Sequence, residues 1–79
     1  MTPKTVVSAG GGTWSYGTVA DSSGLKGCYS DYLHNSKYHS ATAIIANGTD
    51  KEYANSGYWA DAYAYAGWAY TCHVYWSTY

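Results

Sequence analysis

The stretch Tyr58-Trp59-Ala60-Asp61-Ala62-Tyr63-Ala64-Tyr65-Ala66 decides the fold of this chain. Its alanines alternate with larger side chains, so a β-strand would place small residues on one face and tyrosines on the other. On a helix the tyrosines would scatter around the axis, although the alanine content leaves a helix over residues 58–66 as the alternative. The alternation therefore favours a strand.

Further strand candidates lie on both sides of this stretch. Thr13–Ala20, Gly27–Leu33 and Tyr38–Ala46 precede it, and Trp68–Trp76 follows Gly67. Alternate residues of the last strand share one face, which we expect to face the core. These residues are Trp68, Tyr70, Cys72, Val74 and Trp76.

The strand candidates are separated by residues that favour turns. The turn segments are Asp21-Ser22-Ser23-Gly24, His34-Asn35-Ser36-Lys37, Asn47-Gly48 and Asn55-Ser56-Gly57. Asn47-Gly48 predicts a type I′ turn, because both residues tolerate positive φ. Short strands with turns at regular spacing predict an all-β fold, a small antiparallel β-sandwich of two sheets with about three strands each.

The N-terminal residues differ in composition from the rest of the chain. Residues 1–11 run into Gly10-Gly11-Gly12 and have little apolar pattern beyond Val6-Val7. We expect residues 1–11 to be a flexible lead-in, or else a loosely attached edge strand, and residues 12–79 to form the domain.

Length and composition exclude several classes of protein. The chain has 79 residues, four Lys and no Arg against five Asp and Glu, and a net charge of −1. It therefore has room for one small domain, lacks the positive field that nucleic acids require, and is too short to enclose a deep catalytic cleft. No apolar run reaches the roughly 20 residues of a transmembrane segment.

Aromatic residues dominate the apolar content. The chain has eleven Tyr and four Trp but no Phe. Rings in this number exceed what the interior of a small domain can hold, so we expect some of them on the surface, where exposed Tyr and Trp mark a recognition face. Composition therefore favours a binding function.

The two cysteines favour a structural role. Cys28 and Cys72 lie 44 positions apart without a second cysteine at metal-ligand spacing, which leaves one disulfide or two thiols, and we predict the disulfide. A nucleophilic thiol is disfavoured because Cys72 and His73 would point to opposite faces of a strand.

Other catalytic and metal sites receive little support. Asp31, Asp50, Glu52 and Asp61 show no spacing that would pair two carboxylates around a glycosidic bond. His34 and His39 could meet at a turn, but no third ligand stands beside them, and hydrogen bonds explain them as well as a metal does. We predict no enzyme activity, no metal and no cofactor.

Two segments resemble the lactococcin 972 family of secreted bacteriocins. The first is Gly12-Thr13-Trp14-Ser15-Tyr16-Gly17, followed by Tyr29-Ser30-Asp31-Tyr32 and by His34-Asn35-Ser36-Lys37-Tyr38-His39-Ser40-Ala41-Thr42. The second is Gly57-Tyr58-Trp59-Ala60 with the aromatic ending Tyr75-Trp76. The resemblance covers the chain from about Gly12 to Tyr79.

The resemblance implies a small β-sandwich that Gram-positive bacteria secrete through a cleaved leader and that acts on the envelope of related cells. Its implied partner is lipid II, whose binding would block septum synthesis without forming pores. The start Met1-Thr2-Pro3-Lys4 lacks an apolar signal segment, which fits either a cytosolic protein or a chain whose leader has been removed. We expect the second case, a secreted protein from which the leader has been removed.

Lipid II offers a pyrophosphate and amino sugars, so a receptor needs hydrogen-bond donors and flat rings. We predict donors from His34, Ser36, Lys37, His39 and Ser40, and stacking surfaces from Trp14, Tyr16, Tyr32 and Trp59. Core packing is the alternative role for the rings of Trp14, Tyr32 and Trp59. A position in a solvated turn is the alternative for Lys37.

Two other functions remain open at this stage. A carbohydrate-binding or adhesive module would use the surface tyrosines and tryptophans, and a small secreted hydrolase would use a carboxylate or a histidine. We also expect that the chain can form homodimers, because unpaired strand edges and surplus aromatic rings favour self-association.

Overall fold

The computed structural model describes residues 5–79, which form two antiparallel sheets without a helix. The strands are β1 (Thr5–Ala9), β2 (Gly12–Ala20), β3 (Lys26–Leu33), β4 (His39–Ile45), β5 (Gly48–Ala54), β6 (Trp59–Ala66) and β7 (Cys72–Thr78). One sheet has the order β1-β2-β3-β6 and the other has the order β5-β4-β7. The predicted all-β sandwich is confirmed, with sheets of four and three strands.

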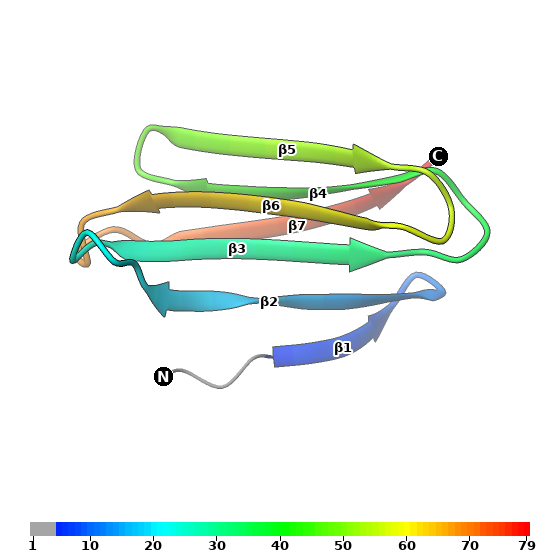
Figure 1. Cartoon of the computed structure of the whole chain (residues 1–79), viewed down its shortest axis with the longest axis horizontal. Coiled ribbons are helices and arrows are strands. Elements are labelled where there is room, and N and C mark those ends of the chain that lie inside the picture. Colours follow the sequence, from blue (N-terminus) through cyan, green and yellow to red (C-terminus); the bar gives the residue numbers. More distant parts are fainter. Residues whose placement is uncertain (1–4) are drawn as a thin grey trace.

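The connections gather at the two ends of the sandwich (Figure 1). One end holds the β1–β2 hairpin, the β3–β4 loop, the β5–β6 turn and the C-terminus, and we call it the loop end (Figure 1). Backbone hydrogen bonds join its segments, because Gly57 N donates to His34 O at 2.9 Å and Tyr79 N donates to Tyr38 O at 2.9 Å. The loop end is therefore a continuous surface built from segments distant in sequence.

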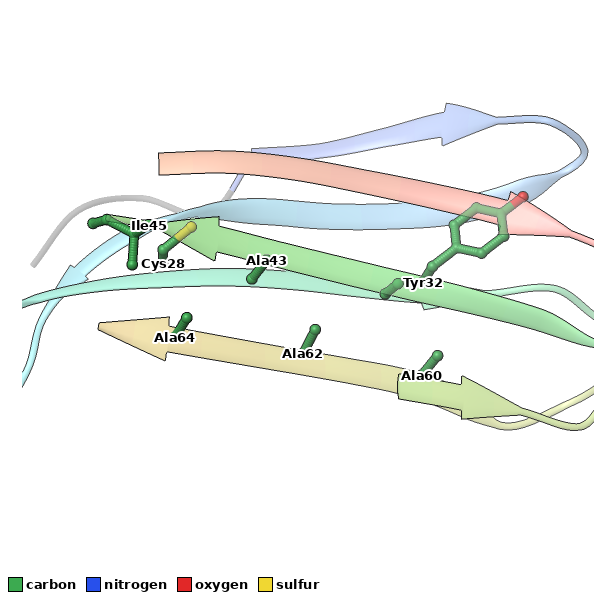
Figure 2. Packing of buried hydrophobic residues seen from close by; sticks show 8 residues of the cluster. Cys28, Tyr32, Ala43, Ile45, Ala60, Ala62 and Ala64 are labelled. Carbon is green, nitrogen blue, oxygen red and sulfur yellow. The ribbon is translucent and has the colours of Figure 1, made fainter. Parts of the chain in front are cut away.

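The strand β6 has the predicted alternation. Ala60, Ala62 and Ala64 are buried, whereas Asp61 and the tyrosines between them are exposed. Figure 2 shows the three alanines in a row along β6 with their side chains directed at the interior. The opposing strand β4 also buries alanines, Ala41 and Ala43, so the two sheets meet there through small side chains. The helical alternative is wrong.

Aromatic rings fill the part of the core nearer the loop end. Tyr32 is fully buried, and its ring stacks on Trp76 with centroids 5.0 Å apart. The Tyr32 hydroxyl donates to Ala9 O at 2.7 Å, so a polar group at this depth has a partner. At the opposite end of the core lie Cys28 and Ile45 (Figure 2).

The disulfide predicted between Cys28 and Cys72 is confirmed. It joins β3 of one sheet to β7 of the other, with the Cα atoms 5.5 Å apart. The alternative of two thiols is wrong.

The last strand begins later than predicted. Cys72, Val74 and Trp76 pack against the core, but Trp68 and Tyr70 are exposed in the connection between β6 and β7. The physical reason is the change of sheet after Ala66, since β7 lies beside β4 and the chain must cross between the two layers first. Lys26 Nζ fixes this crossing by donating to Tyr70 O at 2.8 Å.

The hairpin between β4 and β5 also differs from the prediction. Ile45 pairs with Gly48, so Ala46 and Asn47 form the two-residue connection and Gly48 begins β5. Among the described residues, Ala46 is the one non-glycine position with positive φ (54°). A type I′ turn needs positive φ at both central residues, so the turn is of another type and lies one residue earlier.

Residues 5–9 of the predicted lead-in form the strand β1, which pairs only with β2. The three-stranded sheet has no strand that faces β1, as Figure 1 shows. Residues 1–4 of the lead-in lie outside the described residues. The predicted start of the domain, Gly12, is the first residue of β2.

Candidate functional site at the loop end

The nine predicted site residues differ in burial. Four are buried, namely Tyr32, His34, His39 and Ser40. Trp14 and Tyr16 are half-buried, and Ser36, Lys37 and Trp59 are exposed. The structure therefore separates side chains that can touch a ligand from those that support them.

Trp14 and Tyr16 lie on the inner face of β2. Their ring centroids are 4.2 Å apart, and Trp14 Nε1 donates to Ser30 Oγ at 2.9 Å. The Trp14 ring packs against the core, and Tyr32 on β3 is fully enclosed by it. These three rings face the interior and form no common outer surface with Lys37.

His34 shapes the loop that carries Ser36 and Lys37. Its Nδ1 accepts the backbone N–H groups of Ser36 at 3.2 Å and of Lys37 at 3.1 Å. An imidazole nitrogen that accepts two amide hydrogens replaces the strand partners that these residues lack after β3 ends. The buried side chain of His34 thus fixes the conformation of this loop.

His39 ties this loop to the β5–β6 turn. The ring has no exposed surface, and its two nitrogens lie 2.8 Å from Lys37 O and 2.7 Å from Tyr58 O. Carbonyl oxygens can only accept hydrogen bonds, so the ring donates to one of them when it is neutral and to both when both nitrogens carry a proton. In either form the ring lies between two separate backbone segments. His39 is a positioning residue for the loop end.

Four exposed side chains are presented by these two segments, and we call them the loop-end surface. They are Ser36, Lys37, Tyr58 and Trp59. Tyr58 is 70% exposed and Trp59 is 45% exposed, and Trp59 pairs with Leu33, the last residue of β3 before the loop. The structure therefore brings a cation, a hydroxyl and two flat rings to one end of the molecule.

A second group of aromatic residues lies on the outer face of the three-stranded sheet and was not predicted. Tyr38, Tyr53 and Tyr79 form it, and we call it the tyrosine cluster. Their ring centroids lie 5.8–6.0 Å apart, and Lys51 Nζ lies 5.3 Å from the Tyr53 ring centroid. The predicted site residue Ser40 reaches this cluster, because its Oγ lies 3.1 Å from the Tyr79 hydroxyl.

The tyrosine cluster alters the protonation of its own members. The Ser40 hydroxyl, followed by Ser77 and Lys51, lowers the pKa of Tyr79 below its usual value. The hydroxyls of Tyr53 and Tyr79 raise the pKa of Lys51. Lys51 is therefore a firmly charged ammonium group beside three rings.

A signal for this cluster was present in the sequence. A hairpin turn at residues 47–48 implies a second strand after it, and Thr49, Lys51 and Tyr53 alternate in the segment that becomes β5. Tyr38 and Tyr79 flank strands that are far apart in the chain, so only the pairing of β4 with β7 brings them together.

Neither a cluster of metal-binding side chains nor a membrane-spanning helix is found among residues 5–79. No three His, Cys, Asp or Glu side chains among them gather in a way that could hold a metal ion. Within the same part of the chain, no helix is long and apolar enough to cross a membrane.

Comparison with known proteins gives one match. No curated protein and no solved structure matches the chain significantly. The model of the family described as Bacteriocin (Lactococcin_972) matches residues 10–76, which include β2 to β6 and the first five residues of β7. Because this match covers most of the chain, the protein is a member of the Lactococcin_972 family of bacteriocins, a family of secreted proteins that are not enzymes.

Proposed function

We propose that this bacteriocin binds the cell-wall precursor lipid II in the envelope of related Gram-positive bacteria and blocks septum synthesis without forming pores. The observation that supports the proposal is the loop-end surface, where Lys37 and Ser36 are exposed beside Tyr58 and Trp59. A lysine ammonium and a hydroxyl group suit the pyrophosphate of lipid II, and flat rings suit the faces of its sugars.

The roles of the predicted residues follow from their burial. Lys37, Ser36 and Trp59 would touch the ligand, because they are exposed. His34 and His39 would position the loop without touching the ligand, since their ring nitrogens hold backbone groups. Trp14, Tyr16 and Tyr32 would stabilise the sandwich behind the site.

The proposal also includes removal of a leader during secretion and pairing of two copies. The edge strand β1 pairs only with β2, and a second β1 could add to its open edge in the antiparallel sense. Mass spectrometry of the protein recovered from the medium tests the leader, and sedimentation equilibrium tests the dimer. A leader-bearing or strictly monomeric protein would contradict the corresponding part.

The central test is a tryptophan-fluorescence titration of the oxidised protein with lipid II. Undecaprenyl phosphate and the soluble nucleotide precursor are the comparison ligands, because each lacks part of lipid II. We expect saturable binding to lipid II alone. We also expect Lys37→Ala to weaken binding by about tenfold in low salt, the effect of losing a hydrogen bond to a charged group.

Lys26→Ala serves as the control for the Lys37 variant, since it removes the same charge at the opposite end of β3 from the loop end. Equal binding by the parent protein and Lys37→Ala would exclude the phosphate role of Lys37. An intact fold without any lipid II binding would contradict the receptor assignment. Retention on glycans without inhibition of bacterial growth would instead support the alternative of a carbohydrate-binding module.

A further inference from the structure

We propose that the tyrosine cluster, Tyr38, Tyr53 and Tyr79 together with Lys51, is a separate binding site for a phosphate-bearing glycan. The site lies on the outer face of the three-stranded sheet, whereas lipid II is assigned to the loop-end surface. The inference therefore does not depend on the proposed receptor. It concerns a glycan that would hold the protein at a bacterial surface.

The three rings form a platform that the fold keeps in place. Tyr53 belongs to β5, Tyr38 directly precedes β4 and Tyr79 directly follows β7, so the platform crosses all three strands of the sheet. The Tyr38 and Tyr53 rings are nearly parallel, with 11° between their planes. The backbone bond from Tyr79 N to Tyr38 O fixes the remaining pair. No induced rearrangement is needed to assemble the rings.

The rings remain about half exposed in spite of contacting one another. Tyr38, Tyr53 and Tyr79 are 46%, 51% and 58% exposed. Stacked tyrosines on an open sheet face supply large, rigid contact area with little loss of side-chain freedom on binding. The C–H groups of a sugar ring can stack on the electron-rich faces of such rings. A flat, open platform of this kind suits an extended glycan chain.

The charge of this face is complementary to an anion. Among the described residues, the strand positions facing outward on this sheet carry Lys51 and His73 but no carboxylate. Asp50 and Glu52 point to the other side of β5, where Asp50 accepts the backbone N–H of Tyr63 at 2.9 Å. Asp31 and Asp61 lie on the outer face of the other sheet. An anionic ligand would therefore meet the Lys51 ammonium group without an opposing Asp or Glu side chain on this face.

The cation on this face is a lysine, which favours a ligand with a phosphate group over a ligand with a carboxylate group. The chain has no Arg, whose forked guanidinium group matches a carboxylate in two hydrogen bonds. A lysine ammonium acts as a point charge that phosphate oxygens can approach from several directions. The hydroxyl groups of Tyr53 and Tyr79 next to Lys51 offer further donors to the same group.

The test is an NMR titration that follows the tyrosine ring signals. The probe is poly(ribitol phosphate) glycosylated with N-acetylglucosamine, which has sugar and phosphate but neither lipid nor peptide. The N-acetylglucosamine tetramer supplies the neutral arm, and inorganic phosphate supplies the sugar-free arm. We expect the phosphate-bearing glycan to shift the Tyr38, Tyr53 and Tyr79 signals and the other two ligands to bind at least about tenfold more weakly.

Variants separate stacking from charge. Tyr53→Ala and Lys51→Gln should each weaken binding by about tenfold, whereas Tyr53→Phe and Lys51→Arg should retain most of it, because they keep the ring or the charge. Tyr65→Ala is the matched control, since Tyr65 is similarly exposed (57%) on the other sheet. The NMR spectrum of each variant shows whether it is folded.

Equal binding of the neutral tetramer would overturn the role of Lys51, and unchanged binding by Tyr53→Ala would overturn the platform. Loss of glycan binding in Lys37→Ala but not in Lys51→Gln would place the glycan at the loop-end surface and also overturn the inference. The two proposals fail separately, because lipid II binding is tested through Lys37 and glycan binding through Tyr53 and Lys51.

Discussion

Two tyrosine hydroxyl groups of this protein lie in opposite environments. Tyr79 is exposed and hydrogen-bonded to the Ser40 hydroxyl, which is the main reason that its pKa lies below the usual value. Tyr32 is enclosed by the core, and burial raises its pKa. A hydrogen bond to the anion favours ionisation, whereas burial disfavours it. The pKa values of these two tyrosines are therefore shifted in opposite directions.

This contrast predicts the order of ionisation in alkaline solution. Tyr79 should lose its proton at a lower pH than Tyr32. Because the pKa of Tyr32 is raised in the folded state, its contribution to stability is complete below the unfolded value, near 10, and is lost as pH rises through the folded value. Ring-carbon NMR signals followed against pH measure the order.

Ser40→Ala is the informative variant for this titration. It should move the Tyr79 pKa upward, toward the ordinary value, while the Tyr32 pKa stays unchanged. A Tyr79 titration that is identical in Ser40→Ala and in the parent would show that the hydroxyl contact does not operate in solution.

At the scale of single residues, the sequence predicts which residues gather at the loop end better than it predicts whether their side chains face solvent or the core. It selects Ser36, Lys37 and Trp59, which the structure exposes at one end of the sandwich. It does not distinguish them from Tyr32 and His39, which are buried, because burial of these residues depends on Trp76 and Tyr58 from distant strands or turns. Only tertiary structure supplies those partners.

At the scale of elements, β6 shows how small side chains set the distance between the sheets. Ala62 is 1% exposed and lies between Ala60 and Ala64 in a row that faces the alanines of β4. Such close packing leaves no volume for a longer side chain.

We therefore expect Ala62→Leu to destabilise the protein by about 1–3 kcal/mol, the usual effect of overpacking a core. Chemical denaturation followed by fluorescence measures the change in the free energy of unfolding. Tyr65→Leu, at an exposed position of the same strand, should have little effect. Comparable losses in both variants would contradict the assigned role of the alanine row.

The strand predictions are correct where the alternation of side chains lies within one strand. They are wrong where the chain crosses from one sheet to the other. The alternation in residues 58–66 predicts β6 to within one residue. The alternation that starts at Trp68 continues through the crossing to the other sheet, so it does not show that β7 begins only at Cys72. The hairpin after Ile45 shifts by one residue because Ala46 adopts the conformation expected of Asn or Gly.

At the scale of the whole molecule, one covalent bond joins the two layers. The disulfide links Cys28 in β3 to Cys72 in β7, which are 44 residues apart. In the chain-entropy model, closing a loop of this length stabilises the folded state by about 4 kcal/mol. A domain of this size has a small core, so such a contribution is a large fraction of its stability.

Replacing both cysteines by serine should thus lower the free energy of unfolding by about 4 kcal/mol. Thermal unfolding followed by circular dichroism, with and without reductant, measures the effect. Reductant should destabilise the parent protein and leave the double variant unchanged. A parent protein that is as stable reduced as oxidised would show that the noncovalent contacts suffice.

The position of β7 also has a consequence for export. It is the last strand, yet it supplies one of the two neighbours of the central strand β4 and the partner of Cys28. A chain that crosses a membrane unfolded and N-terminus first cannot complete the second sheet, or form the disulfide between Cys28 and Cys72, until β7 has emerged. Pairing between distant segments forms late in folding. If the protein is exported unfolded, its two sheets would therefore be linked by the disulfide only on the outer side of the membrane.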